Sequence, residues 1–145
     1  MFRIVFVAAA LMFAGYGPVA AQSFDTDAHC NRIANVGGTH SNTLELSCRK
    51  REAADKDAVQ QMYAPDTVRE HCERIAQVGG TGSYGLLKTC ITREIADKDA
   101  VQQMYASDSV RAHCEKIAKV GGTASYGLMK TCITREMKAA AELRK

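Results

Sequence analysis

Apolar residues recur along the chain at the spacing of one helix face, and the pattern returns at a fixed interval. Val68, Cys72 and Ile75 stand at i, i+4 and i+7, and the same spacing of the same residue types returns in the stretch 110–117. Residues at these spacings lie on one side of an α-helix. The pattern therefore predicts a short amphipathic helix that occurs more than once.

A glycine pair follows each short helix, and a second helical pattern follows the glycines. Gly79–Gly80 and Gly121–Gly122 are suited to helix C-caps, because glycine accepts the left-handed conformation there. Ser83 and Ser125 are placed to cap the next helix. That helix is longer, roughly 84–105 in the middle copy, and carries apolar pairs at i,i+4. The predicted unit is a short helix, a glycine turn and a long helix.

The unit occurs three times. Residues 62–94 and 104–136 agree at 26 of 33 positions, and the first copy is more divergent. The repeat period, counted in residues from position 62 to position 104, is typical of helix-pair repeats. The fold class predicted is therefore all-α, a tandem array of three helical hairpins in one mature domain, 22–145. The predicted boundaries are repeat 1 at 22–64, repeat 2 at 65–106, and repeat 3 with a charged C-terminal cap at 107–145.

Each long helix outruns the short helix of its own unit. Its apolar face must therefore be covered by the neighbouring unit. We expect Met62, Tyr63, Met104 and Tyr105 to pack between units.

The six cysteines fall into three pairs with the same spacing in the sequence. In the middle unit the two members lie about 9 and 10 Å from the glycine turn at 1.5 Å per residue, so they face each other in an antiparallel hairpin. The same geometry holds in all three units. It predicts the disulfides Cys30–Cys48, Cys72–Cys90 and Cys114–Cys132.

The N-terminal segment, 1–21, is typical of an export signal. Arg3 precedes an uncharged apolar run, 4–15, and small residues at 19–21 suit a signal peptidase. We expect cleavage after Ala21 and no membrane span thereafter, since spanning takes about 20 apolar residues. Together with the cysteine pairs, this predicts a bacterial periplasmic or secreted protein in an oxidising compartment.

Composition and motifs narrow the function classes. The formal net charge is +3 and the charges are interspersed, so no nucleic-acid stripe is indicated. The sequence has no Ser-His-Asp arrangement, no phosphate loop, no zinc-protease helix and no C-x-x-C-H haem attachment motif. We therefore expect a protein that is not an enzyme and holds no cofactor, with a protein or an envelope component as its partner.

A histidine precedes the first cysteine of every unit: His29, His71 and His113. In a stacked array these could form a ladder that binds copper, zinc or haem. The alternative is structural, because adjacent residues diverge by about 100° on a helix and His and Cys cannot easily grip one ion.

The hairpin tips are a second candidate surface. Ser83, Tyr84, Ser125 and Tyr126 place hydroxyls, backbone amides and an aromatic ring at helix N-termini, which favour anions or sugar hydroxyls. The alternative is a turn with an N-cap and a tyrosine packed on the short helix. A charged pair, such as Arg51-Glu52, follows each second cysteine and is expected on a solvated face or in an inter-helix ion pair.

The motif Cys72-x-x-Ile75-Ala76-x-x-Gly79-Gly80-x-x-Ser83-Tyr84-x-x-x-x-x-Cys90-x-x-x-Glu94 resembles that of small, uncharacterised exported proteobacterial proteins with such cysteine-pair units. This resemblance covers most of the mature chain and implies no activity. Cys48, Ala54-Asp55 and Tyr63 give a fainter similarity to lysozyme-inhibitor-like periplasmic proteins. The leading hypothesis is a non-enzymatic binding protein of the envelope. The alternatives are an inhibitor of an exported hydrolase such as lysozyme, and metal or haem binding through the three histidines.

Overall fold

The computed structural model describes residues 23–77, 79–119 and 122–145. The predicted signal peptide, 1–21, lies outside the described residues. All regular secondary structure in the described part is helical. The helices are α1 (Thr26–Ala34), α2 (Asn42–Gln61), α3 (Asp66–Ala76), α4 (Tyr84–Gln103), α5 (Asp108–Ala118) and α6 (Tyr126–Glu142).

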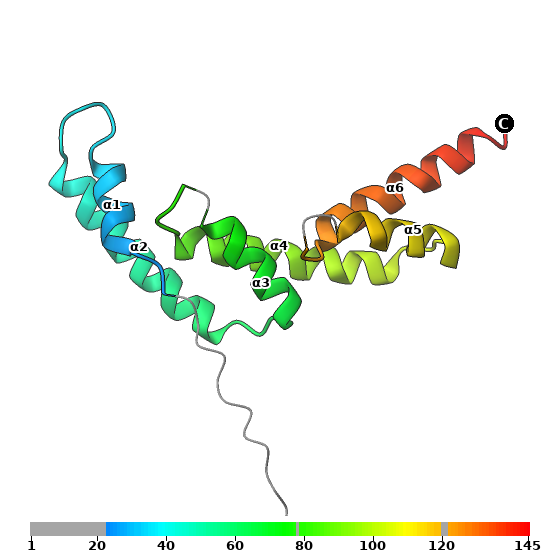
Figure 1. The fold of residues 1–145 in the computed structure, drawn as a ribbon, viewed down its shortest axis with the longest axis horizontal. Coiled ribbons are helices and arrows are strands. Elements are labelled where there is room, and N and C mark those ends of the chain that lie inside the picture. The colour runs from blue at the N-terminus through cyan, green and yellow to red at the C-terminus, as the bar shows by residue number, and fades with distance from the viewer. Residues whose placement is uncertain (1–22, 78, 120–121) are drawn as a thin grey trace, which may run out of the picture.

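Short and long helices alternate, and each consecutive pair forms an antiparallel hairpin (Figure 1). We refer to α1 with α2 as unit 1, α3 with α4 as unit 2, and α5 with α6 as unit 3. One disulfide joins the two helices of each unit, with a Cα–Cα distance of 5.5 Å in all three. The pairs are Cys30–Cys48, Cys72–Cys90 and Cys114–Cys132, so the predicted fold class and pairing are confirmed.

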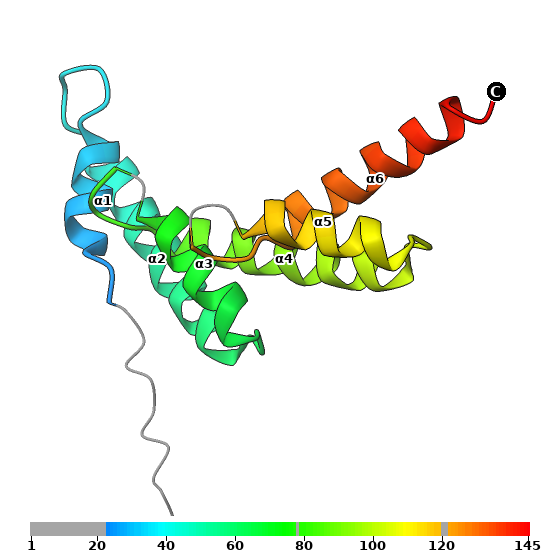
Figure 2. The ribbon, with the colours of Figure 1, turned by 45° about the vertical axis from the view of Figure 1, so that its right-hand side comes forward.

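The units follow one another in an elongated array whose long helices make the contacts between units. Among the described helices, α2 packs on α4 and α4 packs on α6, whereas the backbone of each short helix lies close only to the long helix of its own unit. Figures 1 and 2 show unit 2 between the other two, with the C-terminus at the far end of unit 3. Each unit therefore contacts only its neighbours, as in other repeat proteins.

The turn of unit 2 depends on glycine. Helix α3 ends at Ala76, and Gly79 and Gly80 follow with φ of 95° and 89°, a region that other residues rarely adopt. Gly82 is required for a different reason, because a Cβ there would lie 2.3 Å from the Phe24 ring. Phe24 itself is buried, and its ring centroid lies 4.9 Å from that of Tyr84.

The extra length of each long helix completes the core of the next unit. Val59 of α2 is buried with Val68, Cys72 and Ile91 of unit 2, and Val101 of α4 is buried in the core of unit 3. The expected coverage by a neighbouring unit is thus confirmed.

The methionines and tyrosines after the long helices behave differently from each other. Met62 and Met104 are partly buried against these cores, as expected. For Tyr63 and Tyr105 the expectation of inter-unit packing is wrong. Their exposed fractions are 90% and 94%, because the chain leaves the long helix before each tyrosine and turns it away from the core.

No helix within the described residues is long and apolar enough to cross a membrane.

Replacing Cys72 and Cys90 together by alanine should lower the free energy of unfolding by about 3 kcal/mol, because a disulfide that closes a short loop restricts the unfolded chain. Urea unfolding of the oxidised protein, followed by circular dichroism, measures the change. A loss below about 1 kcal/mol would show that inter-unit packing, and not the disulfide, holds the hairpin together. The exposed variant Tyr105→Ser serves as the control and should leave the unfolding midpoint unchanged.

Candidate functional site

A buried carboxylate on each long helix caps the N-terminus of the next long helix. Glu52 of α2 is only 5% exposed. Its Oε1 accepts from the Ser83 hydroxyl at 2.7 Å, and its Oε2 accepts from the Tyr84 backbone N–H at 2.6 Å. The Gly85 N–H also reaches Oε1, at 3.4 Å. A carboxylate at this place satisfies helix amides that have no partner within the helix and opposes the positive end of the helix dipole.

The junction between units 2 and 3 repeats this arrangement. Glu94 of α4 is also 5% exposed, and it accepts from the Ser125 hydroxyl at 2.8 Å and from the Tyr126 N–H at 2.5 Å. Gly127 fits closely here, since a Cβ would lie 3.4 Å from Glu94 Oε1 and 3.2 Å from Asp97 Oδ2. The two junctions therefore use the same residue types at the same positions of the repeat.

These contacts bear on two expectations from the sequence. Glu52 and Glu94 do not lie on a solvated face, because their carboxylates are enclosed between two units. At the helix N-termini formed by Ser83, Tyr84, Ser125 and Tyr126, the bound anion is a carboxylate of the preceding unit. The amides at these tips are thus bonded within the protein rather than presented to an external ligand.

Further polar contacts reinforce each junction. The Lys88 ammonium lies 2.7 Å from Asp55, and Lys130 lies 2.6 Å from Asp97. Arg32 of α1 donates to the Gly79 carbonyl at 2.5 Å and to another oxygen of the same turn at 2.6 Å. The short helices therefore take part in the junctions through side chains, although their backbones do not pack on the next unit.

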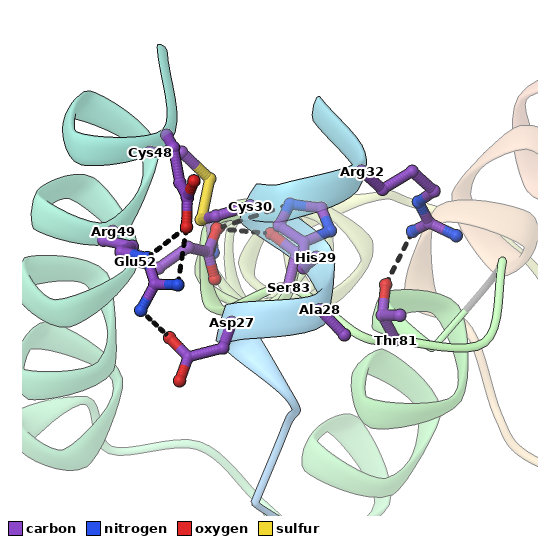
Figure 3. The surroundings of a disulfide bond; sticks show 12 residues. Asp27, Ala28, His29, Cys30, Arg32, Cys48, Arg49, Glu52, Thr81 and Ser83 are labelled. Atoms are coloured by element: carbon purple, nitrogen blue, oxygen red, sulfur yellow. Dashed lines mark hydrogen bonds and ion pairs between the residues drawn. A yellow bond between two sulfur atoms is a disulfide. The ribbon is translucent and has the colours of Figure 1, made fainter. Parts of the chain in front are cut away.

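The histidines of units 1 and 2 lie beside the capping carboxylates. In Figure 3 Glu52 points from α2 toward His29 and Ser83, next to the Cys30–Cys48 disulfide. His29 Nε2 lies 3.9 Å from Glu52 Oε1, and His71 Nε2 lies 3.8 Å from Glu94 Oε1. Each histidine is thus held against the long helix of its own unit.

The second ring nitrogen differs between the two junctions. His71 Nδ1 lies 3.1 Å from the Thr123 hydroxyl of the next turn. In the first junction the equivalent hydroxyl, that of Thr81, accepts from Arg32 instead, and His29 Nδ1 is buried without a hydrogen-bond partner among the described residues. The two junctions are similar in architecture but not identical in polar bonding.

The three histidines do not converge on one site among the described residues. The described residues contain no group of three or more His, Cys, Asp or Glu side chains placed to hold a metal ion. All six cysteines are in disulfides, and His113 is exposed at the end of the array. The three histidines occupy the same position of the repeat. His29 lies at the junction of units 1 and 2, His71 at the junction of units 2 and 3, and His113 in unit 3 at the end of the array.

Two hollows on one surface of the array form the strongest candidate for a binding site. We call them groove 1, between units 1 and 2, and groove 2, between units 2 and 3. They have volumes of about 460 and 860 Å³. Groove 1 is lined by His29, Ile33, Leu44, Ser47, Cys48, Arg51, Glu52, Ser83, Gly85, Leu86 and Thr89. For every one of these positions, the equivalent position of the next repeat lines groove 2.

The grooves combine exposed aliphatic side chains with an exposed arginine. Ile33 and Ile75 are 38% and 42% exposed, and Leu86, which lines both grooves, is 49% exposed. Arg51 and Arg93 are exposed at the edge of grooves 1 and 2, whereas the nearby glutamates are occupied by the helix N-termini. Each groove can therefore take an apolar side chain and place a neighbouring carboxylate against the arginine.

A third hollow, of about 530 Å³, lies on α2, α3 and α4 and is lined largely by charged residues. Burial raises the pKa of Glu73 there, the charge of Arg69 lowers it, and Glu70 raises it further. The acidic pair is not repeated, because unit 3 has Ala112 at the position of Glu70. The recurrence that marks the two grooves is absent here.

The chain matches no protein-family model, no curated protein and no solved structure. The sequence did contain one signal for the grooves that spacing arguments about the core overlooked. Ile33, Leu44 and their counterparts recur at the period of the repeat but lie off the buried face. Ile75, which the spacing placed on one face with Val68 and Cys72, is 42% exposed.

Replacing Glu94 by glutamine should lower the free energy of unfolding by about 1.5–3 kcal/mol, the range for hydrogen bonds to a charged group. The amide keeps one acceptor oxygen but turns an N–H₂ toward one of the two donors of α6. Chemical unfolding at neutral pH measures the loss.

The matched control is Glu136→Gln, the same substitution at the same repeat position in unit 3, where the carboxylate has no hydrogen-bond partner among the described residues. It should change stability by less than about 0.5 kcal/mol, as most surface substitutions do. Equal effects of both substitutions would contradict the capping role of Glu94.

Proposed function

We propose that the protein is an exported, non-enzymatic binding protein of the bacterial cell envelope, and that it holds a partner protein in its two grooves. The observation that carries this proposal is the recurrence of one groove, with the same exposed residue types, at both junctions of the array. In repeat proteins, surfaces that recur from unit to unit are the usual binding faces.

The exposed aliphatic side chains are the physical basis of the proposal. Isoleucines and leucines in the grooves remain about half exposed in the protein alone. A partner that covers them removes apolar surface from water, which stabilises a complex by about 25 cal/mol per Å² before the costs of association. The backbone of the groove is already fixed by disulfides and inter-unit contacts, so little ordering accompanies binding.

The arginines indicate the chemistry of the partner. Arg51 and Arg93 occupy the same place in each groove and are exposed. An arginine recognises a carboxylate through two parallel hydrogen bonds. We infer a protein segment that presents aliphatic side chains next to Asp or Glu, at two places that match the two grooves.

Export is supported by two independent features. The N-terminal sequence has the organisation of a cleavable signal, and all six cysteines are in disulfides. Disulfides persist in the periplasm and outside the cell, whereas the cytosol keeps thiols reduced.

Leu86→Asp should abolish capture of the partner, because this leucine lines both grooves and a charge there opposes an apolar ligand. Wild type and variant are cross-linked in the envelope of producing cells, and the captured proteins are compared by mass spectrometry. Leu46→Asp is the matched control. Leu46 is on a long helix and 56% exposed but lines neither groove, so this variant should retain the partner. Equal capture by both variants would rule out the grooves.

The exported form should begin at Gln22 and carry three intact disulfides. Intact-mass spectrometry of protein isolated from the envelope fraction, before and after reduction, tests both points. A chain that retains residues 1–21, or one with free thiols, would contradict the proposed export.

A further inference from the structure

The end of the array at unit 3 keeps the residues that receive a following unit at the other two junctions. Glu136 stands at the position of the capping residues Glu52 and Glu94, and His113 stands at the position of their histidine neighbours. Ile117 and Leu128 likewise correspond to groove residues and are 41% and 49% exposed. We call these residues, with Leu143, the acceptor face.

The acceptor face is open, and the charged cap predicted for repeat 3 does not cover it. The Glu136 carboxylate has no hydrogen-bond partner among the described residues, in contrast to the two or three donors around each buried counterpart. Leu143 is 89% exposed, although its counterparts Val59 and Val101 are each 4% exposed in the core of the following unit. Within the described residues, no helix N-terminus is bonded to this equivalent of the internal capping sites.

The opposite end of the array is closed by polar residues. Unit 1 has Thr26, Asn42, Glu45 and Arg49 where unit 2 has the buried residues Val68, Tyr84, Leu87 and Ile91. Glu45 and Arg49 are bonded to each other, with Nη2 to Oε1 at 2.6 Å. Such a polar outer face is what a capped end of a repeat array requires. The open end is therefore not matched by the other end of a second copy.

We propose that the acceptor face binds the N-terminus of an α-helix of a partner protein. The two internal junctions define the chemistry of that helix. Its N-cap is a serine or threonine whose hydroxyl donates to Glu136, its first backbone N–H donates to the same carboxylate, and the second helical residue is glycine or another small residue.

The acceptor face also differs from the internal junctions in one way that bears on the partner. Ala139 and Ala140 of α6 replace Asp97 and Lys98 of α4. The ion pair between Asp97 and Lys130 therefore has no counterpart at this end. In the partner helix, an apolar residue fits at the position that corresponds to Lys130 of α6. We therefore expect no charged side chain in the first turn and a half of the partner helix. The acceptor face shares Leu128 with groove 2, but the inference does not require a partner to bind in the grooves.

The test supplies such a helix from a modified copy of the protein. In this donor chain, Asn42→Tyr, Thr43→Gly, Glu45→Leu and Arg49→Ile give unit 1 the residues of unit 2. Glu136→Ala in the same chain prevents the donor from binding itself. The mature donor is mixed with the unmodified mature protein, and sedimentation velocity measures association.

A one-to-one complex is expected. Glu136→Ala in the acceptor should weaken it about tenfold or more, since bonds to a charged group contribute at least this factor. The unmodified protein mixed with itself should remain monomeric. A donor with three disulfides and native helix content that forms no complex would overturn the proposal, as would a complex insensitive to Glu136→Ala.

A second chain covers the case in which the donor does not fold. Here residues 137–145 are replaced by a second copy of 95–145, which adds a fourth unit after Glu136. Glu136→Ala should lower the unfolding midpoint of this four-unit protein but not that of the natural chain. Equal, negligible effects in both proteins would show that Glu136 receives no helix and would overturn the proposal.

Discussion

The bond between a buried glutamate and the start of the next long helix is the interaction on which the array depends. Each hairpin is closed by its own disulfide, but a disulfide within a hairpin does not place one hairpin on another. Glu52 and Glu94 perform that task because each carboxylate binds a hydroxyl and an amide whose directions are fixed by the helix. The cost of burying the charge is offset by these donors and by the helix dipole. A small displacement of the next helix would leave that charge unsatisfied.

Much of the fold follows from local rules that act within a single unit. The glycine pair sets the turn, and the equal distance of both cysteines from it determines their pairing. The core position of Val59 also follows, because an apolar face that extends beyond its partner helix must be covered. These predictions hold since they require only helix geometry and the exclusion of apolar surface from water.

The contacts between units were harder to predict because they join segments that are distant in the sequence. Glu52 has the sequence context of a surface charge next to Arg51, and nothing in its own segment shows that Ser83 faces it. The prediction that the tyrosine after each long helix is buried was wrong for a related reason. An aromatic side chain suggests burial, but the direction of the chain at the helix end determines whether the ring reaches the core. The grooves depend on the angle between units, which the capping bonds set and which no periodicity encodes. Only their recurrence was visible in advance.

The two grooves are not independent, because they share a wall. Leu86 and Thr89 of α4 line both grooves. A ligand side chain that shifts Leu86 to fill the first groove changes the shape of the second. Occupancy of the two sites is then coupled, and linkage requires each to affect the other by the same factor. A partner that inserts one side chain into each groove would therefore bind cooperatively. Two separate small ligands could instead oppose each other's binding, because both contact Leu86.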